Sequence, residues 1–160
     1  MCGIVGIYGG NLSTIESANS AISHRGPDDY GVYTNQSLKV ALGHQRLSII
    51  DTSSFGHQPM TSDDDRFVLV FNGEIYNYKE LRTELIEKGF TFKSKSDTEV
   101  LLNLYLLEGK GMLSKLNGIF VFAILDTHSE SLFVARDALG VKPLYYLVKD
   151  SMFAFASEIK

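Results

Sequence analysis

The sequence predicts an α+β protein built from packed layers of sheet and helix. Several short stretches rich in Val, Ile, Phe and Tyr, separated by turn residues, have the composition of β-strands. Many of these stretches are apolar at nearly every position, as in strands that are covered on both faces. The helical patterns are fewer and lie together in the chain, which favours an α+β layered sandwich. The predicted strands span residues 4–8, 38–42, 67–71, 119–125, 132–135, 144–148 and 152–156.

Helices are predicted where apolar residues recur on one helical face. Segments 78–90 and 95–111 have this pattern clearly, and a weaker pattern covers about 14–23. Gly89 is a natural end for the first segment. Ser96 and Glu99 fit the capping box S-x-x-E at the start of the second. The predicted buried faces are Tyr78, Leu81, Leu85 and Ile86; Val100, Leu101, Leu104 and Leu107; and Ile15, Ala18, Ala21 and Ile22.

Length and charge limit the classes of function. A chain of 160 residues has the size of one domain with a sizeable core. Its 15 Lys and Arg and 19 Asp and Glu are interspersed and give a formal net charge of −4. Because no basic block stands out, nucleic acid and anionic membranes are poor candidate partners. The apolar runs are too short to span a bilayer and no signal-peptide pattern is present, so we expect a cytoplasmic protein.

Cys2 is the only cysteine in the chain. A single cysteine excludes an internal disulfide and a Cys-rich zinc site, and the four histidines show no metal-ligand spacing. Free cysteines are commonly buried core residues, and Cys2 fits that interpretation. Position two also suits a nucleophile, because removal of Met1 leaves a thiol and a free α-amine on one residue. The α-amine, with a pKa of about 7.7–8.0, can act as the general base for the thiol. Position alone leaves both interpretations open.

Three further positions allow both a structural and a functional interpretation. Asn72-Gly73 follows an apolar run and is typical of a hairpin turn. The alternative is an oxyanion hole formed by a side-chain amide and a backbone N–H. Arg46 is either a surface ion-pair residue or a guanidinium that grips a carboxylate. Asp97 is either part of a helix cap or a carboxylate for a substrate ammonium.

Two turn-rich segments carry charged residues beside Gly and Pro. They are "SHRGPDDYG" at 23–31 and "ARDALGVKPLYY" at 135–146. We expect structured loops there, since their spacing demands no catalytic role.

Taken together, the motifs resemble one family, the class II glutamine amidotransferases. The motifs are "MCGIVGIYG", "HRGPDDYG", "HQRLSIID", "HQPM", "FNGEIYNYKELR", "SDTEVLL", "LNGIFVFAILD", "ARDALGVKPLYY" and "FASEIK". They occur in the family's order and cover essentially residues 1–160 as one glutaminase domain. The "RLSIID" form resembles the asparagine synthetase branch of that family.

The resemblance implies a fold, a reaction and a set of roles. The fold is the N-terminal nucleophile hydrolase fold, a four-layer αββα sandwich of two antiparallel sheets. After removal of Met1, Cys2 would attack the side-chain amide of L-glutamine and form a γ-glutamyl thioester. Ammonia would leave, and water would release glutamate. The implied oxyanion hole is Asn72 and Gly73, and the implied glutamine-binding residues are Arg46, Leu47, Ser48, Ile49, Ile50, Asn72, Gly73, Glu74 and Asp97.

The ammonia acceptor is not encoded in these residues. Asparagine synthetases continue into a larger ATP-using domain with an S-G-G-x-D-S loop, and this sequence contains no such loop. The resemblance therefore implies a synthetase domain or subunit as partner, with ATP and Mg²⁺ used only there, and a homodimer of the full-length enzyme. Aspartate is the first expected acceptor, and a sugar or natural-product acid is the alternative. A non-catalytic docking or regulatory domain is a further alternative if Met1 stays in place.

Overall fold

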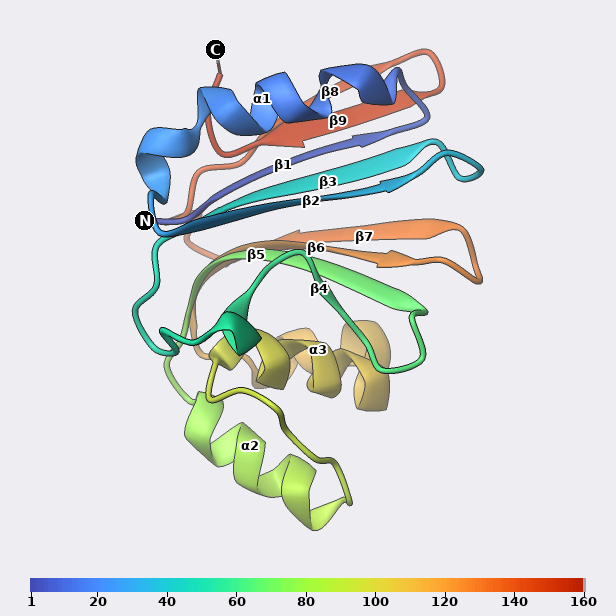
Figure 1. Ribbon diagram of the computed structural model, residues 1–160. Coiled ribbons are helices and arrows are strands. Elements are labelled where there is room, and N and C mark those ends of the chain that lie inside the picture. Colours follow the sequence, from blue (N-terminus) through green and yellow to red (C-terminus); the bar gives the residue numbers. More distant parts are fainter. Residues whose placement is uncertain (160) are drawn as a thin grey trace.

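The computed structural model describes residues 1–159 as four layers, helix, sheet, sheet and helix (Figure 1). One sheet has the strand order β2-β3-β1-β9-β8 and the other has the order β4-β5-β6-β7, with every pair of neighbouring strands antiparallel. The strands are β1 (Gly3–Tyr8), β2 (Asp29–Asn35), β3 (Val40–Arg46), β4 (Met60–Thr61), β5 (Phe67–Ile75), β6 (Gly118–Asp126), β7 (Ser131–Arg136), β8 (Tyr145–Lys149) and β9 (Met152–Ala156). The helices are α1 (Ile15–Ala21), α2 (Tyr78–Glu87) and α3 (Asp97–Glu108). The predicted αββα sandwich is confirmed.

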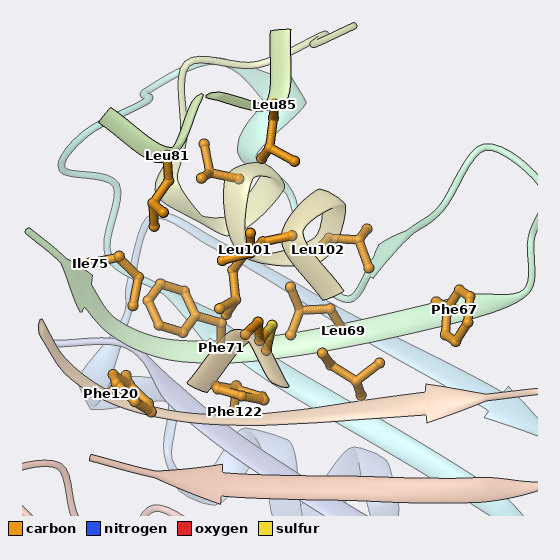
Figure 2. Packing of buried hydrophobic residues seen from close by; sticks show 14 residues of the cluster. Phe67, Leu69, Phe71, Ile75, Leu81, Leu85, Leu101, Leu102, Phe120 and Phe122 are labelled. Carbon is orange, nitrogen blue, oxygen red and sulfur yellow. The ribbon is translucent and has the colours of Figure 1, made fainter. Parts of the chain in front are cut away.

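The alternation of side chains along β5 explains how the layers hold together. Val68 and Val70 point into the apolar layer between the two sheets. Leu69 and Phe71 point the other way, where they pack under α3 (Figure 2). Because both faces are covered, the strand is apolar throughout, as the sequence predicted. Helix α2 packs on α3 and lies farther from the sheet, while α1 covers the outer face of the other sheet (Figure 1).

Every predicted strand and helix exists, but two strands and several details were missed. No predicted strand corresponds to β4, and the segment at 23–31 was expected to be a loop although β2 begins inside it at Asp29. Strand β2 contains Asp, Gly and Asn, which disfavour strands locally, and its pairing with β3 overrides that preference. Two expected core positions, Ile86 and Leu107, are 53% and 39% exposed, and Ala21 is exposed as well.

The hairpin interpretation of Asn72-Gly73 is wrong. Both residues lie inside β5, where Asn72 pairs with Val121 and Gly73 with Phe120 of β6. The strand continues to Ile75, so no turn forms there. A Cβ on residue 73 would collide with the backbone at Ile119 and Phe120, so the strand contact itself requires glycine.

The capping box before α3 forms only in part. Ser96 accepts a hydrogen bond from the Glu99 N–H at 3.2 Å, as predicted. Glu99 reaches back instead to the N–H groups of Lys93 and Ser94, at 2.8 and 2.7 Å. Its carboxylate therefore fixes the segment that leads into the helix rather than the cap residue itself.

Candidate active site

A cavity of about 220 Å³ opens where the start of β1, the end of β3, the middle of β5 and the start of α3 meet. This volume is below the roughly 300–1,000 Å³ of pockets for drug-sized ligands, and it suits a ligand of amino-acid size. The structure brings together at this cavity every residue that the sequence nominated for the site: Cys2, Arg46, Leu47, Ser48, Ile49, Ile50, Asn72, Gly73, Glu74 and Asp97.

The Cys2 thiol lies against the backbone of Leu47. Its Sγ accepts from the Leu47 N–H at 3.3 Å and lies 3.6 Å from the Leu47 carbonyl, to which it can donate. Arg25 fixes the backbone of Cys2, because the Arg25 Nε donates to the Cys2 carbonyl at 2.9 Å. Burial raises the pKa of the Cys2 thiol, and the Leu47 N–H offsets this only in part. A thiol held in its neutral form needs a base before it can act as a nucleophile.

Asn72 presents an unused hydrogen-bond donor at the cavity. The residue is only 1% exposed, yet its Nδ2 has no partner among residues 1–159. A buried amide donor without an acceptor costs about 1–3 kcal/mol, so such a group in a folded protein needs an explanation. The orphaned amide therefore indicates a site prepared for an acceptor oxygen.

The N–H of Gly73 points away from β6, toward the free edge of β5. Phe71 and Ile75, two residues before and after it, direct their N–H groups away from β6, to Gln58 and Asp97 at 2.7 and 3.0 Å. Because strand N–H groups alternate in direction, Gly73 also faces away from β6. Its partner Phe120 confirms this geometry, since the N–H and carbonyl of Phe120 bond to Asp137 on the opposite edge. Gly73 thus offers a second donor, and no hydrogen bond within the described chain uses it.

Arg46 is buried at the end of β3 and anchors the loop that follows. The residue is 7% exposed, and its guanidinium donates to the Ser53 carbonyl at 3.0 Å and to the Asp51 carbonyl. The Asp29 carboxylate lies 3.8 Å away. A side chain at Gly56 would collide with this guanidinium. The arginine is therefore held in place with its charge at the cavity, where it can pair with a carboxylate.

Asp97 is the first residue of α3 and is 5% exposed. Its Oδ2 accepts from the Ile75 N–H at 3.0 Å, which ties the helix to β5. Burial, together with the nearby charge of Glu74, raises the pKa of Asp97 to about 6. This buried carboxylate forms no ion pair with a side chain of residues 1–159, so it is suited to receive an ammonium group.

Several cavity residues were not nominated from the sequence. They are Met1, Asp51, Gly56, Gln58, Phe71, Ser96, Thr98 and Lys142. Gln58 and Lys142 lie inside the quoted motifs "HQPM" and "ARDALGVKPLYY", so the motifs were a usable signal for their location. Lys142 is 7% exposed, and its Nζ lies 3.1 Å from the Met1 sulfur. The segment 135–146, for which no role was expected, therefore contributes a cation to the cavity.

Comparison with known proteins decides the family. The sequence profile of a family described as the glutamine amidotransferase domain matches residues 1–160. The chain belongs to this family. Glutamine-hydrolyzing asparagine synthetase 1 of Bacillus subtilis (strain 168) is 44% identical to the amidotransferase domain over 168 residues, which cover 100% of this chain and 26% of that protein. The amidase chry2 of Gibberella zeae is 39% identical, covering 93% of this chain and 22% of that protein.

A solved structure supports the same assignment. The glutamine phosphoribosylpyrophosphate amidotransferase of Bacillus subtilis, complexed with ADP and GMP, superimposes with a TM-score of 0.80 at 27% sequence identity. The match covers 98% of this chain and 42% of that one. The amidotransferase domain therefore has the two-sheet fold of the N-terminal nucleophile amidotransferases. It spans only about a quarter of the length of the curated relatives named above.

Neither a membrane-spanning helix nor a metal-binding cluster is present among residues 1–159. Within residues 1–159, no helix is long and apolar enough to cross a membrane. In the same part of the chain, no group of three His, Cys, Asp or Glu side chains is placed to hold a metal ion.

Proposed function

We propose that the domain hydrolyses the side-chain amide of L-glutamine through a thioester on Cys2. The observation that carries this proposal is the pair of unused donors, Asn72 Nδ2 and Gly73 N–H, at the cavity that also contains the Cys2 thiol. An amide carbonyl placed between the thiol and the two donors would find a nucleophile on one side and an oxyanion hole on the other.

Acylation requires removal of Met1, which frees the α-amine of Cys2. That amine takes the thiol proton, and the thiolate attacks the side-chain carbonyl carbon of glutamine. The carbonyl π electrons move to oxygen, and the oxyanion accepts from Asn72 and Gly73. The α-ammonium then returns its proton to the leaving nitrogen, the C–N bond breaks, and ammonia departs from a γ-glutamyl thioester.

Deacylation repeats these steps with water. The α-amine removes a proton from water, which attacks the thioester carbonyl, and the oxyanion occupies the same two donors. When the intermediate collapses, the C–S bond breaks and the proton returns to the thiolate. Glutamate leaves and the thiol is restored, so the cycle needs no cofactor in this domain.

Recognition of glutamine is assigned to three charged residues that line the cavity. Arg46 binds the α-carboxylate, while Asp97, with Glu74 beside it, binds the α-ammonium. Backbone and side chains of the loop after β3 line the remainder of the substrate site: Leu47, Ser48, Ile49 and Ile50.

The ammonia is passed to a synthetase domain or subunit, since the curated relatives are much longer than this domain. Aspartate is the proposed acceptor, in an ATP-dependent reaction whose ATP and Mg²⁺ bind in that part. A sugar or natural-product acid is a second candidate, because a relative carries the name amidase and not asparagine synthetase. A homodimer of the full-length enzyme belongs to the same proposal.

The test compares the domain with its Cys2→Ala variant. Alanine is also small, so both proteins should lose Met1, and intact mass verifies this. The unaltered protein is expected to convert glutamine to glutamate and ammonia, and Cys2→Ala is expected to show no turnover. Equal rates in the two proteins would overturn the thioester proposal. Retained Met1 together with an inactive parent protein would favour a docking or regulatory domain instead.

A further inference from the structure

The free edge of β5 is protected by side chains, not by a full neighbouring strand. Strand β4 pairs with β5 only at Val68 and Leu69. Beyond Leu69, the N–H and carbonyl of Phe71 point to this edge, and two side chains satisfy them. The Gln58 Oε1 accepts from the Phe71 N–H at 2.7 Å, and the His44 Nε2 lies 3.0 Å from the Phe71 carbonyl.

His44 can only donate in this contact. The side chain is fully buried between the sheets, and burial lowers its pKa to about 3, so the ring is neutral. A carbonyl oxygen accepts only, which places the single ring proton on Nε2. The other ring nitrogen, Nδ1, has no partner among the described residues. His44 thus donates a single hydrogen bond, which links β3 in one sheet to β5 in the other.

Gln58, in the loop before β4, makes the second contact with Phe71, and together with His44 it forms a clamp on the Phe71 backbone. It is 4% exposed, and its Nε2 lies 3.4 Å from the hydroxyl of Thr98 in α3. The residue before Thr98 is Asp97, which holds the Ile75 N–H. Gln58 therefore connects the strand that bears the oxyanion donors to the helix that bears the ammonium-binding carboxylate.

We infer that His44 and Gln58 are positioning residues that set the oxyanion donors by fixing the Phe71 peptide. This inference rests on the proposed function. A longer β4 would satisfy the same edge but would also cover the Gly73 N–H. Gln58 and His44 satisfy the backbone of Phe71 but do not reach Gly73, the next residue whose N–H points to this edge. The Gly73 N–H therefore stays free to bind an oxyanion. The Phe71 carbonyl belongs to the peptide that carries Asn72, so a shift of that peptide moves both donors away from the oxyanion.

The experiment uses Gln58→Met and His44→Leu, which remove the two bonds, and Gln58→Glu and His44→Gln, which retain an acceptor or a donor. Ser62→Ala is the matched control. Ser62 Oγ accepts from the Phe67 N–H at 2.9 Å on the same edge of β5, remote from the cavity. All variants are measured as the Met1-processed protein, with kcat and KM for glutamine and a melting temperature.

A second measurement separates positioning from a merely structural role. Glutamate γ-semialdehyde, the aldehyde analogue of glutamine, should add the Cys2 thiol and place its new oxygen in the oxyanion hole. L-glutamate binds without forming that oxygen. Loss of one oxyanion donor lowers kcat by about 10²–10³. Misplaced donors should lower kcat by roughly 10–100-fold in Gln58→Met and His44→Leu, and weaken aldehyde inhibition by a similar factor. KM and glutamate inhibition should change by less than about threefold.

The results decide the inference separately from the proposed function. An active parent protein with kcat within twofold in folded Gln58→Met and His44→Leu would overturn the positioning role alone. Partial recovery in Gln58→Glu and His44→Gln would support it. If the apolar variants do not fold, Gln58→Asn decides, since it shortens the reach with little change in packing. A tenfold lower kcat in Gln58→Asn supports the inference, and an unchanged kcat in that variant overturns it. An inactive parent protein would reject the proposed function itself.

Discussion

The two walls of the cavity are built in different ways. Asn72 and Gly73 lie in β5, which pairs with β6 over its whole length and is covered on both faces. Arg46 instead holds loop carbonyls at Ser53 and Asp51, and in that loop Ile49 is 71% exposed. Groups that stabilise a transition state need a rigid frame, whereas groups that recognise a substrate are often carried by loops. Turnover and binding should therefore respond separately to changes in the two walls.

The largest effect is expected on the strand wall. Asn72→Ala removes the unpartnered amide and should lower kcat by about 10²–10³, with KM nearly unchanged, because the bond forms mainly in the transition state. Steady-state glutamine hydrolysis measures both parameters. The fold should persist, since the lost Nδ2 has no partner within the described chain. An unchanged kcat would return Asn72 to a structural role.

Arg46→Ala tests the loop wall and should affect binding most. A hydrogen bond to a charged group contributes about 1.5–3 kcal/mol, so KM for glutamine should rise roughly 10- to 100-fold. The fall in kcat should be smaller than in Asn72→Ala. Because the Ser53 and Asp51 carbonyls also lose their donor, the melting temperature is measured beside KM. A variant in which kcat falls and KM does not would contradict the separation of the two walls.

Asp97 accepts a hydrogen bond from Ile75 in the strand wall and lines the same cavity as the loop wall. With its pKa raised to about 6, the carboxylate that would bind the substrate ammonium is mostly protonated at pH 5. KM for glutamine should therefore rise about tenfold between pH 7 and pH 5. Asp97→Asn should have a high KM that no longer depends on pH in this range. A KM that stays flat from pH 7 to 5 in the unaltered protein would contradict this role.

The same titration has an opposite consequence for stability. Since folding raises the pKa of Asp97 from an ordinary 3.8, folding favours the protonated form. Its contribution is fully present below pH 3.8 and is lost as the pH rises through about 6. Asp97→Asn removes the buried charge, and its side-chain oxygen can still accept from the Ile75 N–H. The substitution should therefore raise the free energy of unfolding at pH 7, by at most about 3 kcal/mol. Thermal unfolding at pH 4 and pH 7 measures the difference.

The sequence predicted which residues line the cavity better than it predicted the strands that support them. Cys2, Arg46 and Asn72 were nominated because their motifs are specific, although each alone had a structural interpretation, and all three line the cavity. The Asn72-Gly73 turn was wrong because local turn preference cannot reveal that β6 pairs through both residues. The clamp by His44 and Gln58 could not be predicted, since its partner is the backbone of Phe71. That contact depends on where the two-residue strand β4 ends, which no periodicity in the sequence marks.

The smallest expected effect comes from a contact behind the loop wall. The Asp28 carboxylate accepts from the Ser48 N–H at 2.8 Å, and Asp28 itself is exposed. An intramolecular hydrogen bond contributes about 0.5–1.5 kcal/mol, so Asp28→Ala should raise KM by only about 2- to 10-fold. Because no atom of Asp28 lines the cavity that holds Cys2, kcat should be unchanged. Asp28→Asn keeps an acceptor oxygen and should restore KM, whereas a fall in kcat in Asp28→Ala would mean that the loop also positions the thiol through Leu47.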